Sequence, residues 1–296
     1  MSDKVTVILP VYNRSASLYE ACKSVLDQSY RNLELIVVDD ASTEDLCNVI
    51  KALDDPRLTY VRHEKNQGAA AARNTGLALV DSPLIAFQDS DDMWLPGKLE
   101  AQVKLLASLP EDVGAVTGGK ILYGVNIDRA PGPGRVTYAP TPGRWLRPEV
   151  DQVRHILTEN RVSLQNALFR AGCYPEVAWF DPRAKANNDW EFVIRLVQHT
   201  KVYEDPEPVV LSFISADSIS TNLRKKITGQ VRLLKKNRHL SEKYPAQYAR
   251  QQFVLGRGLW RTGKRSAAKR FMAQGVRDCP ALVFDMARAR IARLWR

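Results

Sequence analysis

The sequence predicts an α/β protein with a Rossmann-like, mostly parallel central sheet, helices on both faces and a C-terminal helical extension. Short apolar runs alternate with helical patterns over the first 120 residues, which is typical of strand–helix–strand units. These runs are continuously apolar, as in parallel strands that are buried on both faces. The 296 residues, 45% of them hydrophobic, are enough for one large domain or one domain with an appendage.

The expected elements follow one another along the chain. Apolar, β-branched runs predict strands at residues 4–10, 33–38, 58–61 and 84–87. Apolar residues at helical spacing predict helices around residues 18–25, 46–53 and 68–80, and another from residue 96. Five prolines and three glycines at 126–148 predict an irregular loop, either a lid or a linker. Helices are then expected at 150–158 and 189–199, and strands near 164–169 and 208–214.

Charge divides the chain near residue 220. Residues 221–296 hold 20 Lys and Arg but three acids, a balance of +17, whereas the rest of the chain has a balance of −7. An acidic body suits a cation site, and a basic region suits an anionic surface such as a membrane or a nucleic acid. Residues 249–280 look similar to a tetratricopeptide-type helical hairpin.

The end of the chain predicts a short basic amphipathic helix. Its apolar positions are Phe284, Ala287, Ile291, Leu294 and Trp295, and its basic positions are Arg288, Arg290, Arg293 and Arg296. Such a helix can lie on an anionic membrane surface, or it can pack on the protein through its apolar face. Both readings stay open.

Several features bear on where the protein acts. No run of 18 apolar residues exists, and no signal peptide is expected at the N-terminus. The four cysteines are scattered, which is typical of reduced thiols. We expect a cytoplasmic protein, with a peripheral position at the inner face of the cell membrane as the alternative.

Polar residues follow three of the predicted strands. They lie at 10–13, at Asp39-Asp40 and at 89–92. Ligands of open α/β sheets bind beyond the carboxyl ends of the strands, so this edge is the expected site. Asp89 and Asp91, one residue apart, can share a divalent cation, and hard oxygen ligands favour Mg²⁺ or Mn²⁺. Taken alone, either pair also fits a turn or a helix cap.

Four motifs in order make the site more specific. They are residues 5–14, 36–43, 66–74 and 87–96, with Val-Asp-Asp-Ala-Ser and Asp-Ser-Asp-Asp at the centres of the second and fourth. Together they resemble the family 2 glycosyltransferases with the GT-A fold, over roughly residues 4–220. The resemblance implies a catalytic domain at 1–220, with nucleotide-sugar binding at about 1–120 and the acceptor side at about 121–220. Residues 221–296 would form a basic α-helical region.

The resemblance also implies roles for single residues. It places the donor's nucleoside near Pro10, Tyr12, Asn13 and Asp40, with Asp39 beside it. Arg73 would approach the base and phosphates, Asp89 and Ser90 would help to hold the donor, and Asp91 with Asp89 would bind Mn²⁺ or Mg²⁺.

The catalytic base implied by the resemblance is Asp189. The family usually has Glu-Asp at this point, and this chain has Asn188-Asp189. Asp189 could also serve as the N-cap of the 189–199 helix, and Glu191 is the second choice for the base. Where many relatives carry a histidine that reaches the metal or diphosphate, this chain has Ser215. This departure suggests looser metal binding in the free enzyme.

The expected function is that of an inverting hexosyltransferase. It would move a sugar from a nucleotide-sugar, in particular a UDP-sugar, to a saccharide or lipid-linked saccharide in polysaccharide or glycoconjugate biosynthesis. The alternative is a catalytically silent nucleotide-sugar-binding or scaffolding subunit. No nucleic-acid partner is expected, because the basic region lacks interleaved aromatic motifs.

Overall fold

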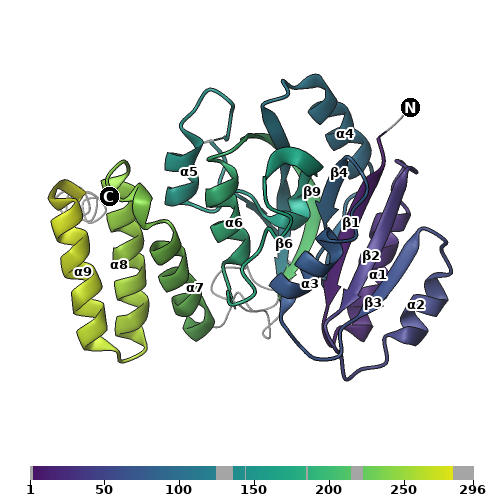
Figure 1. Ribbon diagram of the computed structural model, residues 1–296, viewed down its shortest axis with the longest axis horizontal. Coiled ribbons are helices and arrows are strands. Elements are labelled where there is room, and N and C mark those ends of the chain that lie inside the picture. The colour runs from purple at the N-terminus through teal and green to yellow at the C-terminus, as the bar shows by residue number, and fades with distance from the viewer. Residues whose placement is uncertain (1–2, 125–135, 144, 185, 215–222, 283–296) are drawn as a thin grey trace.

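The computed structural model describes residues 3–124, 136–143, 145–184, 186–214 and 223–282. Within these residues a nine-stranded sheet has the order β3-β2-β1-β4-β8-β6-β9-β5, with β7 paired to β6. In that order the strands span Leu58–Arg62, Leu33–Asp39, Val5–Val11, Leu84–Phe87, Ala167–Arg170, Val113–Gly124, Lys201–Ile214 and Asp92–Trp94, and β7 spans Val136–Ala139. Figure 1 shows helices on both faces of this sheet.

The sheet is parallel in its first half and mixed in its second. β1 runs parallel to β2 and β4, and β2 runs parallel to β3. β8 is antiparallel to both of its neighbours, β4 and β6, while β9 runs parallel to β6. The carboxyl ends of β1, β2, β4, β6 and β9 therefore lie at one edge, since two antiparallel steps restore the direction.

Alternate residues of the buried strands face two separate cores, as the two-residue period of a strand requires. Val5, Val7 and Leu9 pack in a cluster with the helices α1 (Ser15–Leu26) and α4 (Lys98–Ser108). Ile8 faces the opposite cluster, which includes residues of the helices α3 (Ala69–Leu77), α5 (Gln152–Thr158) and α6 (Asn188–Leu196). The short helix α2 (Cys47–Leu53) lies beside α1.

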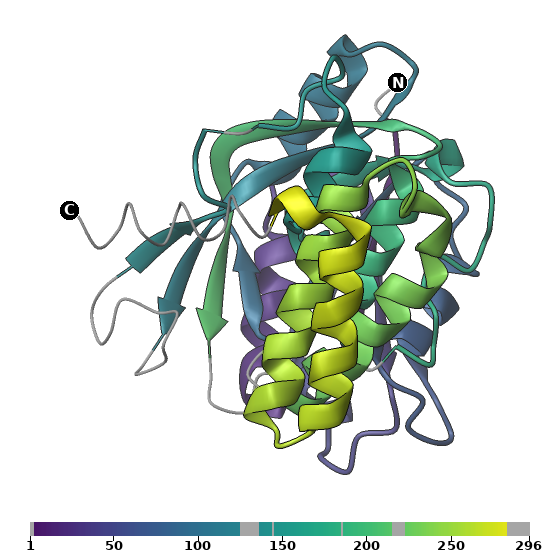
Figure 2. The same cartoon turned by 90° about the vertical axis from the view of Figure 1, so that its left-hand side faces the viewer.

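The C-terminal region continues the second core. Helix α7 (Leu223–Lys236) contributes Leu233, and the turn after it contributes Leu240 and Tyr244, to the cluster that contains Phe192 of α6. Helices α8 (Pro245–Arg261) and α9 (Arg265–Asp278) form a hairpin, which Figure 2 shows in front. The helical hairpin expected at 249–280 is therefore present. None of the described helices is both long and apolar enough to pass through a bilayer.

The sequence missed some strands of the second half. Residues 136–139 form β7, so the irregular loop predicted for 126–148 is wrong at these positions. Val136, Thr137 and Tyr138 do favour a strand, but the prolines and glycines on both sides hid this short run, and pairing with Lys120–Tyr123 of β6 supplies its hydrogen-bond partners. β5 and β6 were also not expected. Ser215 and the amphipathic pattern at 284–296 lie outside the described residues.

Candidate active site

The polar residues that follow the parallel strands meet at one edge, as the sequence predicted. Val11 pairs with Asp39, and Ile8 pairs with Phe87, so the segments after β1, β2 and β4 leave the sheet side by side. The backbone N–H of Gln88 donates to the carbonyl of Ile8 (3.0 Å), which continues this pairing beyond β4. This carboxyl edge holds all the predicted donor-site residues except Arg73, which reaches it from α3.

Asp39 is fully buried and is bound on both oxygens. Its carboxylate accepts hydrogen bonds from the Ser42 N–H (2.8 Å), the Tyr60 hydroxyl (2.6 Å) and the Arg62 guanidinium (2.7 Å). Burial raises the pKa of Asp39, but the hydrogen bonds from Ser42 and Tyr60 and the charge of Arg62 bring it below its ordinary value. Asp39 thus stabilises the turn after β2, the structural role that the sequence also allowed.

Asp40 ties this turn to the start of α3. Its two oxygens accept hydrogen bonds from the backbone N–H groups of Gln67 (2.8 Å) and Gly68 (2.6 Å). Gly68 is the N-cap of α3 with φ +94°, a conformation that favours glycine. Nδ1 of the buried His63 lies 2.9 Å from Asp40, and its Nε2 lies 2.9 Å from Thr75. Asp40 therefore holds the start of α3 against the turn after β2.

The segment after β1 offers one exposed aromatic ring. Pro10 is buried within β1 opposite Val38, so it shapes the strand. Asn13 has φ +50°, and its side-chain oxygen accepts from the Thr43 N–H (2.8 Å), which joins the loops after β1 and β2. Tyr12 between them is 45% exposed, and its ring is free to stack on a flat base.

Arg73 places a buried cation at the edge. Its guanidinium donates to Asp89 at 2.7 Å, while its Nε is buried without a hydrogen-bond partner. An unpartnered buried donor is rare and calls for an explanation. The side chain of Asp89 is 29% exposed, so this ion pair is open to an incoming ligand on one side.

Three acidic residues, Asp89, Asp91 and Asp92, crowd together after β4. The carbonyl of Ser90 accepts from the Ser17 hydroxyl (2.7 Å), which holds the loop on α1. Asp91 is one-third exposed, with the Arg14 guanidinium 3.8 Å away. Asp92 is buried, and burial together with the charges of Asp89 and Asp91 raises its pKa to about 7. Carboxylates that repel one another in this way are stabilised by a divalent cation.

Asp92 joins the candidate site, although the sequence did not predict it. Its carboxylate accepts from the Gln165 side chain (2.8 Å) and from the Phe213 N–H (3.1 Å), so it joins β5, β9 and the segment before β8. Its place in Asp-Ser-Asp-Asp was the only sequence signal. Among the residues that the structure describes, no three His, Cys, Asp or Glu side chains form a ready-made metal site. A cation at Asp91 would therefore need ligands from a bound diphosphate or from water.

Asp189 lies in the first turn of α6. The N-cap of α6 is Asn187, with φ +56°, so Asp189 is not the cap that the sequence also allowed. Its Oδ2 accepts from the Asn160 amide at 2.9 Å. Glu191, the second choice for the base, is buried and bound to Arg195 at 2.8 Å. Asp189 is therefore the better candidate of the two.

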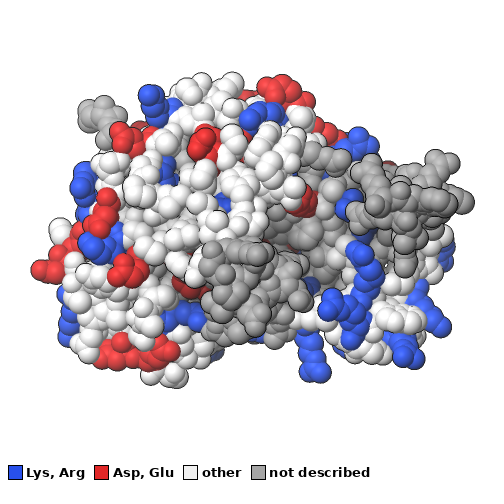
Figure 3. All heavy atoms as spheres, turned by 180° about the vertical axis from the view of Figure 1, so that it is seen from behind, with Lys and Arg blue, Asp and Glu red and all other residues white. Residues whose placement is uncertain are grey.

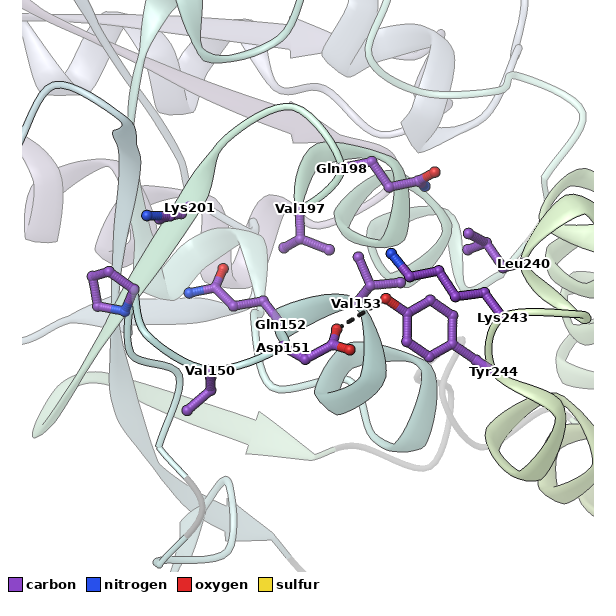
Figure 4. Close-up of a pocket in the computed structure, with 11 residues that line it drawn as sticks. Val150, Asp151, Gln152, Val153, Val197, Gln198, Lys201, Leu240, Lys243 and Tyr244 are labelled. Carbon is purple, nitrogen blue, oxygen red and sulfur yellow. Dashed lines mark hydrogen bonds between the residues drawn. The ribbon is translucent and has the colours of Figure 1, made fainter.

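Two cavities lie near these elements, at opposite edges of the sheet. One of about 470 Å³, shown in Figure 4, is lined by Asp151, Lys201 and Tyr244 among others. Lys201 begins β9, so this cavity lies at the amino edge, away from the acidic cluster. The other, of about 230 Å³, lies between β6, β7 and residues 159–163 and includes Asn160.

A mixed α/β sheet with a polar carboxyl edge and C-terminal helices is the architecture of the GT-A glycosyltransferases. The mannosyltransferase PcManGT from Pyrobaculum calidifontis, solved in complex with GDP-Man and Mn²⁺, superposes with a TM-score of 0.63 at 20% identity, covering 100% of this chain and 83% of that one. S. aureus TarS 1-349 in complex with UDP-GlcNAc gives a TM-score of 0.62 at 17% identity, covering 93% and 89%. The predicted fold is confirmed.

The chain belongs to glycosyl transferase family 2, whose family model matches residues 6–161. A protein of Escherichia coli K12 named putative colanic acid biosynthesis glycosyl transferase WcaA is 27% identical over 267 residues, 87% of this chain and 91% of that protein. The UDP-Glc:alpha-D-GlcNAc-diphosphoundecaprenol beta-1,3-glucosyltransferase WfaP of E. coli is 36% identical over 102 residues, 34% of this chain and 41% of that one.

Some similarities cover a smaller share of the relative. An uncharacterized glycosyltransferase of Rickettsia bellii is 46% identical over 104 residues, which are 35% of this chain and 15% of that protein. The match thus spans well under two thirds of this relative. The sequence prediction of a family 2 glycosyltransferase is confirmed by the family match.

Proposed function

We propose that this glycosyltransferase moves a hexose from a UDP-sugar to an acceptor hydroxyl with inversion, and that it needs Mn²⁺ or Mg²⁺. The observation that carries the proposal is a cluster of carboxylates beside a buried cation at the carboxyl edge of the sheet. Asp89, Asp91 and Asp92 crowd together beside the buried Arg73, and Asp189 stands apart on α6. Such a site can bind a cation with a diphosphate on one side and remove a proton on the other.

Each charged group has a task in this reaction. Asp91 would hold the cation, which supplies charge stabilisation to the departing diphosphate as a Lewis acid. The unpartnered Nε of Arg73 offers a further donor to a phosphate oxygen. The carboxylate of Asp189 takes the proton of the acceptor hydroxyl as its oxygen attacks C1. The amide of Asn160 holds that carboxylate in place through its 2.9 Å hydrogen bond.

The donor side is built from the loops after β1 and β2. The exposed ring of Tyr12 would stack on the base. Asp39 and Asp40 are mainly occupied by protein donors, so we assign them to shaping the nucleoside pocket, with at most one further hydrogen bond each to the base or ribose. We propose UDP as the nucleotide because TarS 1-349 was solved in complex with UDP-GlcNAc and the name of WfaP includes UDP-Glc.

A lipid-linked saccharide is the proposed acceptor, as in the name of WfaP, and an anionic membrane surface is the proposed partner of the C-terminal helices. Figure 3 shows Lys and Arg gathered over these helices, on the right. At the α8–α9 turn, Arg261, Lys264 and Arg265 are exposed beside Trp260, which is 46% exposed. Figure 2 shows this turn at the same end of the molecule as the tip of β9.

Membrane binding through this turn has a direct test. Basic residues add roughly 1 kcal/mol each near an anionic surface, and tryptophan favours the interface. We expect the protein to float with vesicles of 30% phosphatidylglycerol at low salt, and the variant Arg261→Glu/Arg265→Glu to stay in solution. If the wild type and the variant float equally well, the α8–α9 turn does not bind the membrane.

A donor screen tests the proposed function itself. Thermal melting is followed with UDP-, GDP- and dTDP-sugars, with and without Mn²⁺, for the wild type and for Asp91→Ala. Ligand at 100 times its Kd stabilises by about 2.7 kcal/mol, so we expect a clear rise in Tm with UDP-sugar and Mn²⁺ that Asp91→Ala loses. Asp112→Ala, an exposed carboxylate at the amino edge, is the matched control and keeps the rise. A wild type that no sugar nucleotide stabilises would refute the proposal.

A further inference from the structure

A polar cavity adjoins the candidate base. It has a volume of about 230 Å³ and lies under β7, against β6 and the segment that precedes β8. Its wall includes Lys120, Tyr138, Glu159, Asn160 and Ser163. The ring of Tyr138 fits there because it lies on Gly119, where any side chain would overlap it.

Asn160 joins this cavity to Asp189. The residue lines the cavity and also donates its side-chain amide to Oδ2 of Asp189 at 2.9 Å. A group bound in the cavity is therefore one side chain away from the carboxylate that would accept the proton.

The strand register connects the Lys120 side of the cavity to the acidic cluster of Asp89, Asp91 and Asp92. Leu122 of β6 pairs with Ser212 of β9, and Ser212 pairs with Asp92 of β5. Lys120 lies two residues before Leu122, on the same face of β6. Its ammonium donates to Ser163 at 3.0 Å, and Gln165, two residues further on, donates to Asp92. The cavity thus lies between the two parts of the candidate active site.

The wall offers both hydrogen-bond donors and acceptors without a strong net charge. The Lys120 ammonium can donate twice more, and the Glu159 carboxylate, 48% exposed and 3.4 Å from Arg161, has lone pairs left to accept. Arg161 is held by two hydrogen bonds to the buried Glu204, at 2.9 and 2.8 Å, which neutralise it. A diphosphate would meet the Glu159 carboxylate at close range, whereas the hydroxyls of a sugar need such mixed donors and acceptors.

The volume of the cavity narrows the choice of ligand further. Pockets for drug-sized ligands measure roughly 300–1,000 Å³, and this cavity is smaller. It suits one sugar ring rather than a disaccharide.

We propose that this cavity is the subsite for the acceptor's terminal sugar ring, with Lys120 and Glu159 as its specificity-determining residues. The proposal rests on the transfer function proposed above. The ring is held by its hydroxyls between β6 and residues 159–163. Its reacting hydroxyl then points toward Asp189, past the Asn160 amide.

Steady-state kinetics with UDP-glucose, Mn²⁺ and a set of 4-nitrophenyl hexosides as acceptors tests this subsite. The variants are Lys120→Met and Glu159→Gln. Hydrogen bonds to charged groups are strong enough that we expect the KM for the acceptor to rise about tenfold or more in each variant. The KM for UDP-glucose should change less than about twofold. Lys201→Met makes the same substitution on the wall of the other cavity and should leave both constants unchanged.

A measurement of acceptor binding tests the subsite even if turnover is too slow for kinetics. Saturation-transfer NMR with UDP, Mn²⁺ and methyl hexosides should show contact with the wild type that Lys120→Met and Glu159→Gln weaken. Unchanged acceptor KM and unchanged NMR contact in both variants would overturn the subsite while leaving the transfer function intact. If UDP-sugars with Mn²⁺ fail even to raise the Tm of the wild type, the transfer function fails first and the subsite with it.

Discussion

Gly229, in the middle of α7, lies against the backbone carbonyl of Ala186. A methyl group at Gly229 would overlap that carbonyl oxygen and would come within 3.3 Å of the Asn187 side chain. Ala186 and Asn187 lead directly into the first turn of α6, where Asp189 lies. The C-terminal region therefore packs on the very segment that positions the candidate base.

Gly229→Ala should impair turnover more than donor binding. The carbonyl belongs to the backbone and cannot move aside without shifting the turn, and a misplacement of about 1 Å can cost about a hundredfold in rate. We expect kcat to fall at least about tenfold with the KM for the donor nearly unchanged. Gly258→Ala on α8, where the nearest atoms belong to the side chains of Ile227 and Leu223 at 3.2–4.0 Å and not to the backbone, is the control. If Gly229→Ala and Gly258→Ala have the same kcat and KM, the packing of α7 does not position Asp189.

Asp181→Asn should weaken the ionic contact between the segment before α6 and helix α7, and the resulting loss of stability should depend on pH. Asp181 has a side chain 5% exposed and contacts Arg183, with Arg232 and Lys236 of α7 each 3.4 Å away. Burial raises its pKa, but the hydrogen bond from Arg183 and the charge of Lys236 lower the pKa to about 2. A lowered carboxyl pKa stabilises the folded state above the ordinary value of 3.8, and this stabilisation is lost as the pH falls toward 2.

The expected loss for Asp181→Asn is about 1–2 kcal/mol of unfolding free energy at pH 7, after allowance for solvent screening. Thermal melting of both proteins between pH 7 and pH 2.5 measures it. The difference in Tm should be constant down to about pH 4.5 and then shrink. A difference that stays constant down to pH 2.5 contradicts the assignment of the pKa shift to the folded state.

Arg161 and Glu204 should behave as a coupled buried pair. Their side chains are 3% and 0% exposed, and removing one partner of such a pair leaves an uncompensated charge that costs about 3–5 kcal/mol. We expect Arg161→Met to destabilise strongly and the double variant Arg161→Met/Glu204→Gln to be more stable than Arg161→Met alone. Urea unfolding of the wild type, both single variants and the double variant measures the coupling. Additive losses would show that the pair is not coupled.

The sequence predicted the first half of the fold well because each element there carries its own signal. Strand β1 is a continuous apolar run, and Leu18, Ala21, Cys22 and Val25 of α1 repeat at helical spacing and are all buried. The parallel order of these strands then placed Asp39 and Asp89 at one edge without any tertiary information.

The second half depends on pairings that no local pattern encodes. Residues 136–139 have strand-favouring side chains, but their partner β6 lies outside the local sequence, and the antiparallel direction of β8 follows from the path of the chain. In the site, the roles of Asn160 and Gly229 come from contacts across 29 and 43 residues of sequence, with Asp189 and Ala186 respectively. Long-range contacts of this kind are invisible to periodicity and spacing.

The most direct test of Asp189 as the catalytic base compares nucleoside diphosphate release from UDP-sugar with Mn²⁺ by the wild type and by Asp189→Asn. General-base catalysis contributes about 10²–10⁴-fold, so we expect transfer to an acceptor to fall at least about a hundredfold in Asp189→Asn. The rise in Tm with UDP-sugar and Mn²⁺ should persist in this variant. Full transfer by Asp189→Asn, or donor binding without any transfer by the wild type, would contradict a reaction built on Asp189.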